Sequence, residues 1–599
     1  MRFVLLLILI VTSRGSNASD IEAAPSSKPN IIVILADDLG WNDVGFHGGN
    51  QIPTPNIDAL AFNGLILNNH YVPALCTPSR AAFLTGKHPV HTGMQHLVLL
   101  ENEPRGLPLS ERLMPEYLRD EGYVTRAIGK WHLGFFKNEY LPTNRGFDSH
   151  YGYWNGYQDY YSHETQATFE SLRGYDMHRD LNTDWSSVGE YSTRVFTREA
   201  VRQIRDHDTK KPLFMYMAHL APHTGNPDTP FQAPNETLAR FAYIGDPDRR
   251  MYAAMVTELD DSVGEIIQAL RKRSMLSNSI VLFLSDNGAP TYGIHSNRGS
   301  NWPLRGMKQS PWEGGVRGVA AMWAPWLNQT RRVATQLMHM TDWLPTLISA
   351  AGLDPSVLRD KGLDGYDLWP ALNLNTTSPR NEVLHNIDEV DQYAALTKGD
   401  WKYITGTTQN GRVDSWYGES SRGYSDPDYD ASVVLKSKAG SAISSISAPR
   451  PRLSAIEVME IREQAEIKCE KRPSGAANFR CNPLVSPCLF NIMADPCELV
   501  DLSAVRPLVA MSLSQALERW RRTAVPAANV PVDSAGNPKF YNNTWVPWMD
   551  VQRQIINAPS NVPDLTTLAA ILGGVSVGLL ALAAVITKMY LDRKKCDKN

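Results

Sequence analysis

Two apolar segments run directly into acidic and amide side chains: Ile31-Ile-Val-Ile-Leu-Ala-Asp37-Asp38 and Ile280-Val-Leu-Phe-Leu-Ser-Asp286-Asn287. Short, continuous apolar runs of this kind are typical of strands buried in a parallel sheet. In an open parallel sheet, ligands bind beyond the carboxyl ends of the strands. Four oxygen-bearing side chains at that edge would form an anionic cage for Ca²⁺ or Mg²⁺. Each Asp could instead cap the turn that follows it, but two such strand ends favour a metal site.

The pattern extends on both sides of these segments. Leu213 to Ala218 and Val319 to Trp323 are further short apolar runs, and apolar residues recur at helical spacing from Met255 to Leu270. Strands that alternate with helices predict a doubly wound α/β domain at 28–380.

A smaller α+β domain is predicted to follow at 381–550. Leu396 to Ile404 suggests a hairpin, and 415–465 is rich in Ser, Gly and Pro at its start, which favours a long surface insertion. The predicted architecture is therefore a large α/β domain joined to a smaller one.

The composition excludes several classes of protein. The chain has 599 residues, 43% of them hydrophobic, with 59 basic against 63 acidic residues. A net charge of −4 gives no field that would attract nucleic acid, so a nucleic-acid partner is not expected. Apolar and aromatic residues run through nearly the whole chain, which argues against disorder. A large globular enzyme remains.

The two ends predict a membrane-anchored protein of the secretory pathway. An apolar run after Met1-Arg2, followed by small residues, predicts a signal peptide at 1–18. An uncharged segment at 565–587 is long enough to span a bilayer, and the basic tail 588–599 is typical of the cytosolic side. Gly574 and Gly578 are spaced for close helix approach, so a homodimer is a possible assembly.

Cysteines and glycosylation motifs fit a lumenal or extracellular domain. Four cysteines are candidates for two disulfides with three possible connectivities, of which Cys488–Cys497 is expected as a local pair: Cys469, Cys481, Cys488 and Cys497. Cys76 is left over and is either a buried inert thiol or a reactive one. Asn-x-Ser/Thr motifs predict glycosylation at Asn235, Asn328, Asn375 and Asn542.

The segment Cys76-Thr-Pro-Ser-Arg80-Ala-Ala-Phe-Leu-Thr-Gly86 resembles the sulfatase signature. The second signature is similar to Gly122-Tyr-Val-Thr-Arg-Ala-Ile-Gly-Lys130-Trp-His132, and the resemblance continues through Lys308 to Gly315 and Cys488 to Cys497. It covers most of residues 29–545. Gly156 to His163 looks closest to the arylsulfatase B branch. The resemblance implies an alkaline-phosphatase-like large domain, with a mixed, mostly parallel sheet between helices.

The same resemblance implies a role for each motif residue. Cys76 would be oxidised to formylglycine by the formylglycine-generating enzyme, and its hydrate would attack sulfur. One Ca²⁺ per chain would be held by Asp37, Asp38, Cys76, Asp286 and Asn287. Arg80 and Lys130 would hold the hydrate and the metal cage, while Lys308, Lys130 and His223 would meet the substrate.

Two histidines would complete the chemistry. His132 is implied as the base that regenerates the aldehyde, and His223 as the acid for the leaving oxygen. His219 is a nearby rival for the role of His223. Each histidine taken singly is more often structural than catalytic, so these roles rest on the family position.

The predicted function is hydrolysis of sulfate esters on sugars, with N-acetylgalactosamine 4-sulfate as the leading candidate. Alternatives are a sulfatase for small aryl or other sulfated metabolites, a non-catalytic glycoprotein that binds sulfated glycans, and a two-metal phosphodiesterase or phosphatase. The last would need more histidine ligands and a Thr or Ser nucleophile. The expected location is the plasma membrane or the lysosome, with the catalytic domain on the lumenal or outer side.

Overall fold

The computed structural model describes residues 28–291, 297–419, 426–446, 450–469 and 481–557. The described residues up to Pro547 form one compact unit, and Trp548 begins a second, which contains α14 (Trp548–Asn557). Within the described ranges, every helix is too short or too polar to cross a bilayer. The predicted signal peptide 1–18, membrane span 565–587 and tail 588–599 lie outside these ranges and stay predictions.

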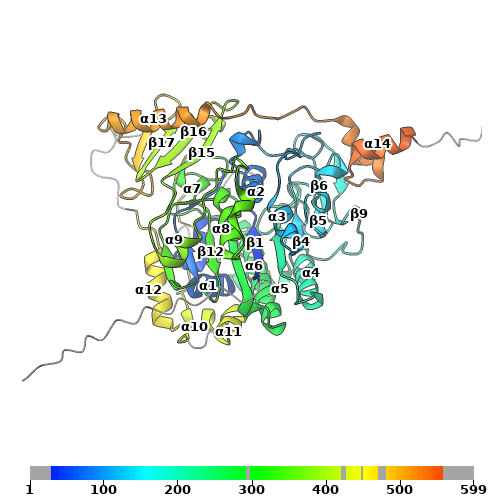
Figure 1. The fold of residues 1–599 in the computed structure, drawn as a ribbon, viewed down its shortest axis with the longest axis horizontal. Helices are drawn as coiled ribbons and strands as arrows, with labels where there is room; N and C mark the ends of the chain where they lie inside the picture. Colours follow the sequence, from blue (N-terminus) through cyan, green and yellow to red (C-terminus); the bar gives the residue numbers. More distant parts are fainter. Residues whose placement is uncertain (1–27, 292–296, 420–425, 447–449, 470–480, 558–599) are drawn as a thin grey trace, which may run out of the picture. The chain divides into compact units, whose positions relative to one another are not determined.

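A ten-stranded sheet forms the centre of the first unit (Figure 1). Its strands run, from one edge to the other, through β13 (Arg332–Ala334), β2 (Leu65–Leu67), β12 (Ala320–Trp323), β11 (Ser279–Ser285), β1 (Asn30–Ala36), β10 (Leu213–Ala218), β4 (Val124–Lys130), β5 (Ser149–Tyr153), β8 (His178–Arg179) and β9 (Asn182–Thr183). The five neighbours from β11 to β5 are parallel. The predicted mixed, mostly parallel sheet is confirmed.

One predicted strand has a different direction. The run Val319 to Trp323 was assigned to the parallel sheet, but β12 pairs antiparallel with both β11 and β2. A fully buried strand in a mixed sheet reads as the same continuous apolar run in either direction. The described part of the connection from β11 to β12 contains only the short helix α7 (Glu313–Val316), and the apolar run itself does not encode the direction of the strand.

Helices cover both faces of the sheet. The predicted amphipathic helix is α6 (Pro247–Lys272), which begins after Asp246, whose side chain accepts hydrogen bonds from the first turn. It packs with α4 (Ser192–Asp206) and α1 (Pro55–Asn63) in the core cluster that contains Ile32 and Ile34 of β1. On the opposite face, Phe83 of α2 (Cys76–Thr85) stacks on Tyr216 of β10. Further helices are α3 (Met114–Asp120), α5 (Asn235–Leu238), α7 (Glu313–Val316), α8 (Trp343–Ala350) and α9 (Trp369–Leu374).

The segment predicted as a surface insertion packs on the large domain. It contains α10 (Ala431–Lys436), α11 (Lys438–Ser444) and α12 (Ala455–Ala465). Helix α11 contacts α1 and α6, and Val434, Ile443 and Val458 belong to the same buried cluster as those helices (Figure 1). Composition at the start of the segment was misleading, because small residues such as Gly440 also permit close helix packing.

A four-stranded antiparallel sheet forms the C-terminal part of the unit. Its order is β15 (Glu382–Asp388), β16 (Tyr393–Lys398), β17 (Trp401–Thr405) and β18 (Cys488–Asn491). The predicted hairpin is the pair β16–β17. Leu396 of this sheet packs under α13 (Pro507–Arg521), while Ile404 packs against Trp312 of the large domain. The sheet therefore joins that domain through one face.

Two disulfides differ from the expected local pair. The bridges are Cys469–Cys497 and Cys481–Cys488, with Cα–Cα separations of 6.0 and 5.6 Å. Cys488 opens the extended strand β18, which carries the chain away from it, so Cys497 pairs with Cys469 instead. The expected pair Cys488–Cys497 was wrong. Cys76 is the free cysteine of the described part of the chain, and it is buried.

The glycosylation motifs stay predictions, and their exposure is compatible with modification. Asn235, Asn375 and Asn542 are exposed, and Asn328 is partly exposed.

Two short sheets complete the list of strands in the described residues, formed by β3 (His70–Tyr71) with β14 (Met338–His339) and by β6 (Glu164–Gln166) with β7 (Arg173–Tyr175).

Candidate active site

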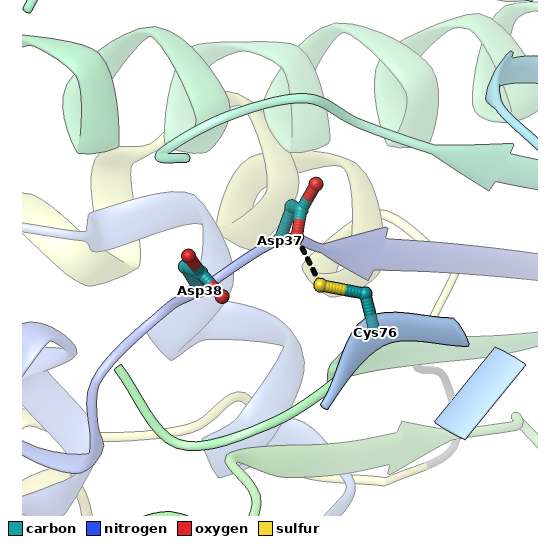
Figure 2. Close-up of side chains that lie close together, drawn as sticks. All are labelled: Asp37, Asp38 and Cys76. Atoms are coloured by element: carbon teal, nitrogen blue, oxygen red, sulfur yellow. Dashed lines mark hydrogen bonds between the residues drawn. The ribbon is translucent and has the colours of Figure 1, made fainter. Parts of the chain in front are cut away.

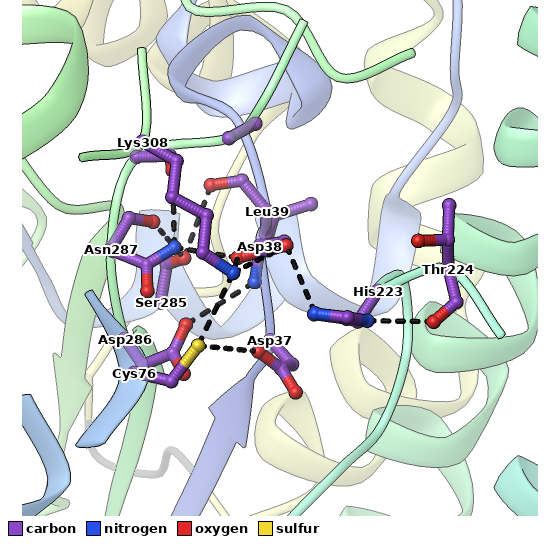
Figure 3. A network of polar contacts seen from close by, with 12 residues as sticks. Asp37, Asp38, Leu39, Cys76, His223, Thr224, Ser285, Asp286, Asn287 and Lys308 are labelled. Atoms are coloured by element: carbon purple, nitrogen blue, oxygen red, sulfur yellow. Dashed lines mark hydrogen bonds and ion pairs between the residues drawn. The ribbon is translucent and has the colours of Figure 1, made fainter. Parts of the chain in front are cut away.

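The predicted metal ligands lie together at one edge of the large sheet. Strands β1 and β11 are parallel neighbours whose last residues are in register. Asp37 and Asp38 therefore leave the sheet beside Asp286 and Asn287, and Figure 3 shows the four side chains close together. All four are fully buried. The sequence pattern alone had indicated this meeting point.

A local backbone conformation turns Asp38 into the site. Its φ of 64° is in the left-handed region, which Asp tolerates better than most residues. The Asp38 backbone N–H donates to Asp286 Oδ1 at 3.2 Å, and Asn287 Nδ2 donates to Asp38 Oδ1 at 2.6 Å. The two strand ends are thus joined by their own side chains.

Cys76 is the first residue of helix α2 and faces the carboxylates. Its Sγ lies 3.7 Å from Asp37 Oδ1 and 3.2 Å from Lys308 Nζ. Figure 2 shows the Cys76 side chain pointing toward Asp37. Burial raises the pKa of the Cys76 thiol to about 12, although Lys130 and Lys308 act in the opposite direction. The unmodified side chain is therefore a protonated thiol and a poor nucleophile.

Three buried cations are paired with the three carboxylates. Arg80 Nη2 lies 2.8 Å from Asp286 Oδ2, Lys130 Nζ lies 2.7 Å from Asp37 Oδ2, and Lys308 Nζ lies 2.7 Å from Asp38 Oδ1. The side chains of the Arg80–Asp286 and Lys130–Asp37 pairs are all fully buried. Buried charges are costly unless paired, so these contacts hold the site in one arrangement.

Burial and ion pairing shift the pKa values of Asp286, Asp38 and Lys308. Burial and the neighbouring Asp37 raise the pKa of Asp286 to about 6. Burial alone would raise the pKa of Asp38, but Lys308 and His223 lower it overall. The Asp38 carboxylate in turn raises the pKa of Lys308 against the effect of burial. Lys308 is therefore a stable cation next to Cys76.

The donor set fits a hard divalent cation. One ligand atom from each of Asp37, Asp38 and Cys76 lies within 4.8 Å of the others. The buried Asn287 Oδ1 has no hydrogen-bond partner among the described residues. Carboxylate and amide oxygens are the ligands that Ca²⁺ takes, and an unpaired buried oxygen gains from meeting a cation.

His132 lies beside the residue that follows Cys76. Thr77 Oγ1 donates to the His132 carbonyl at 3.2 Å, and His132 Nε2 donates to the Leu99 carbonyl at 3.0 Å. The neutral ring therefore leaves Nδ1 unprotonated, and this buried nitrogen has no hydrogen-bond partner in the described structure. Burial lowers the pKa of His132, with Lys130 adding to the effect. The ring is therefore neutral, and its Nδ1 lone pair is unpaired in the described structure.

The structure separates the two candidates for the acid. His223 Nδ1 lies 2.7 Å from the Thr224 carbonyl, and its Nε2 lies 3.5 Å from Asp38 Oδ2 (Figure 3). His219 instead lies 3.0 Å from Ser262 of α6, in the helix layer. Burial lowers the pKa of each ring to about 3, and Asp38 opposes this for His223. The geometry thus brings His223, not His219, to the carboxylates.

Sequence reasoning missed one group at the site. The ring of Tyr157 stacks on His223 with 5.7 Å between ring centroids and an interplanar angle of 20°. Tyr157 lies within the segment that suggested the branch, but nothing in its spacing indicates a contact 66 residues along the chain. Only the fold shows it.

Three buried cations, each paired with a carboxylate, surround Cys76 and the start of α2. They lie at the carboxyl ends of parallel strands, where open α/β sheets bind their ligands. Residues 29–353 match the family model described as Sulfatase. The chain belongs to the sulfatase family.

Relatives and solved structures agree with this assignment. The chain is 38% identical to arylsulfatase J of Mus musculus over 532 residues, which cover 88% of this chain and 81% of that protein. It is 33% identical to arylsulfatase A of Homo sapiens, over 63% of this chain and 75% of the relative. The crystal structure of Ps i-CgsB in complex with k-i-k-neocarrahexaose has a TM-score of 0.64 at 26% identity, and covers 86% of this chain and 98% of its own.

Another group of relatives is named for the 6-sulfate of N-acetylgalactosamine, whereas the sequence suggested the 4-sulfate. The chain is 34% identical to N-acetylgalactosamine-6-sulfatase of Sus scrofa, over 62% of this chain and 70% of that protein. The similar proteins therefore include enzymes named for aryl sulfates and for a sulfated amino sugar.

Proposed function

We propose that this protein hydrolyses sulfate esters of sugars through a formylglycine hydrate derived from Cys76. The observation that carries the proposal is the position of Cys76 at the start of α2, between Lys308 Nζ at 3.2 Å and Asp37 Oδ1 at 3.7 Å. An unmodified thiol with a pKa of about 12 is unsuited to attack sulfur, whereas a hydrate offers two hydroxyls on one carbon.

The reaction would proceed in two steps. One hydroxyl of the hydrate attacks sulfur and passes its proton to Asp37, whose carboxylate lies 3.7 Å from Cys76 Sγ, while the bond from sulfur to the sugar oxygen breaks and that oxygen takes a proton from the protonated form of His223. Asp37 returns its proton to His223 before the next turnover. The second hydroxyl then gives its proton to His132 as the carbon–oxygen bond to sulfate breaks, which releases sulfate and regenerates the aldehyde. Water restores the hydrate. Each histidine is used in one step.

The chain's own cations would stabilise the charge of the sulfate group. Lys308 is a permanent cation beside the nucleophile, and Lys130 is fixed by Asp37 on the other side. Positioned donors aimed at developing negative charge are among the largest contributions to catalysis. Arg80 would act mainly through Asp286, which it fixes with two hydrogen bonds.

A calcium ion fits the same site. Asp37, Asp38, Asp286, Asn287 and the modified Cys76 side chain would hold it. When bound, calcium supplies positive charge that lowers the pKa of the hydroxyl nucleophile.

Peptide mass spectrometry tests the modification. Protein made in a secretory host should carry an aldehyde or its hydrate at Cys76, and Cys76→Ala should abolish sulfate release without changing secretion. A free thiol at Cys76 in fully active protein would contradict the mechanism.

The substrate class follows from similarity. Relatives named N-acetylgalactosamine-6-sulfatase and a fold neighbour in complex with a neocarrahexaose favour a sulfated sugar, without favouring the 4-position. We propose N-acetylgalactosamine 4-sulfate, and small aryl sulfates should also react because their alcohols leave easily. A panel of galactosamine 4- and 6-sulfates with an aryl sulfate discriminates the alternatives. A non-catalytic role is disfavoured because Cys76, Arg80 and the metal ligands are all present.

The remaining assignments belong to the same proposal. A catalytic domain at 28–380 and a C-terminal domain at 381–550 would lie in the lumen or outside the cell, where the modifying enzyme and the disulfides require them to fold. Membrane anchoring through 565–587 is part of this proposal. Detergent extraction of the full chain, compared with secretion of a chain ending near Asp564, tests it.

A further inference from the structure

One short segment contacts both histidines of the site. Trp154 to Tyr157 follows β5, next to the strand β4 whose end carries Lys130. The pairing continues beyond the strands, because the His132 N–H donates to the Trp154 carbonyl at 3.1 Å. We infer that Gly156 and Tyr157 are positioning residues, Gly156 for His132 and Tyr157 for His223. The inference rests on the proposed function.

Gly156 lies directly against the ring of His132. A Cβ added to Gly156 would come within 2.7 Å of His132 Cε1 and 2.9 Å of Nε2, which is closer than real Cβ contacts. The same Nε2 makes the 3.0 Å hydrogen bond to Leu99 that fixes the tautomer. Any side chain at Gly156 would therefore push the ring away from Leu99 and redirect Nδ1.

Tyr157 holds the ring of His223 from its face. The two rings are nearly parallel, which limits rotation of the imidazole about its χ2 torsion. The Tyr157 hydroxyl donates to the Gln166 carbonyl at 2.6 Å, so the aromatic ring is itself fixed at both ends. The stacking and the Thr224 carbonyl together aim His223 Nε2 at Asp38.

The segment is anchored on its other side by a buried acid. Asp176 accepts from the Asn155 backbone N–H at 3.0 Å, from Asn155 Nδ2 at 2.8 Å and from the Trp154 backbone N–H at 3.2 Å. Asp176 is fully buried. Support of this kind is what keeps a catalytic group within a fraction of an ångström of its working position.

The two contacts should have different kinetic signatures. In the proposed reaction His132 acts when sulfate leaves the enzyme, a step that is the same for every substrate. His223 protonates the leaving alcohol, which matters for sugars and little for activated aryl sulfates. A substitution at Gly156 should therefore change the sulfate-release rate for all substrates alike. A substitution at Tyr157 should instead change the ratio between the rates for sugar sulfates and aryl sulfates.

The experiment measures kcat on N-acetylgalactosamine 4-sulfate and on p-nitrocatechol sulfate. Tyr157→Leu should lower kcat on the sugar at least tenfold and on the aryl sulfate less than threefold. Tyr157→Phe, which keeps the ring, should restore the wild-type ratio. Gly156→Ala should lower the rate constant of the sulfate-release step, measured by rapid mixing at saturating substrate, by the same factor of tenfold or more for both substrates. Equal losses on both substrates for Tyr157→Leu, or none, would overturn the role of Tyr157, and a wild-type rate for Gly156→Ala would overturn that of Gly156.

A control separates positioning from loss of stability. Tyr175→Leu removes a buried ring that stacks on Trp185, and it should lower the melting temperature without changing the substrate ratio. Crystal structures of Tyr157→Leu and Gly156→Ala provide a second readout. The His223 ring should rotate away from Asp38 in the first, and the His132 ring should leave Leu99 in the second; unmoved rings overturn the inference. If the wild type releases no sulfate from either substrate, the proposed function fails, while the crystal structures still decide the positioning.

Discussion

The guanidinium group of Arg80 binds Asp286 through two nitrogens, with Nε at 3.2 Å and Nη2 at 2.8 Å from the same carboxylate oxygen. Arg80 lies one helical turn after Cys76 on α2, and Asp286 directly follows the last residue of β11. This pair therefore fixes the helix that begins with Cys76 to the strand end that carries Asp286 and Asn287.

Loss of Arg80 should be costly to the fold. Arg80→Ala leaves Asp286 as a buried carboxylate without its main cation, so the free energy of unfolding should fall by about 3–5 kcal/mol. Denaturant unfolding of the purified protein measures it. Arg198→Ala, which removes an exposed cation paired with Glu190, is the control and should change stability by less than about 0.5 kcal/mol. Equal effects of both variants would show that the buried pair does not stabilise the site.

Calcium should stabilise the wild type through Asp286. A ligand that binds only the folded state at 100 times its Kd adds about 2.7 kcal/mol. Saturating calcium should therefore raise the melting temperature of the wild type and leave that of Asp286→Ala nearly unchanged, with little turnover in the variant. Glu265→Ala, at an exposed carboxylate of α6, should keep the wild-type response. A full calcium response in Asp286→Ala would remove this residue from the metal site.

His88 predicts a pH dependence of stability. Burial lowers the pKa of His88 in the folded protein to about 4, from an ordinary value of 6.5. The unfolded chain therefore binds a proton below pH 6.5 that the folded protein does not, so this contribution destabilises progressively as pH falls from 6.5 towards 4.

The size of the effect is about 1.4 kcal/mol per pH unit, or about 2 kcal/mol between pH 6.5 and 5. His88→Gln should lack it, so the difference in unfolding free energy between variant and wild type should shift by that amount over this interval. Denaturant titrations at the two pH values provide the measurement. A pH-independent difference would mean that His88 does not titrate as its burial indicates.

His223→Ala should distinguish substrates by their leaving groups. The variant lacks the proton donor, so hydrolysis of sugar sulfates should fall at least a hundredfold and that of activated aryl sulfates less than tenfold. His219→Ala serves as the control because that ring lies against Ser262, and the substrate ratio should stay at the wild-type value. Equal losses for both substrate classes in His223→Ala would exclude His223 as the acid.

The sequence was most informative where chemistry and periodicity coincide. The runs before Asp37 and Asp286 predicted adjacent buried strands, and their shared edge predicted that these acids meet. The stripe from Met255 to Leu270 predicted α6 for the same reason: one face of each element must be buried, and that requirement is visible in a single chain.

Contacts between distant segments could not be predicted from the sequence. The direction of β12, the partner of Cys497 and the packing of α11 depend on how the chain returns in space, which local composition does not encode. The preference for His223 over His219 came from the family resemblance alone, since the two differ by four residues and by the direction in which the loop after β10 turns. Tyr157 carries no motif of its own, and its stacking on His223 follows only from the tertiary fold.

Packing of α10 to α12 into the main core has a consequence for timing during synthesis. The core cluster of the large domain is incomplete until Val458 and Ala465 have been added. At about 5–20 residues per second, the roughly 390 residues between Cys76 and the end of α12 take about 20–80 s to make. An enzyme that modifies Cys76 in the growing chain would have this interval before folding hides the thiol. If burial of Cys76 waits for this core, a helix near the far end of the described chain would set how long the thiol stays accessible to the modifying enzyme of the proposed function.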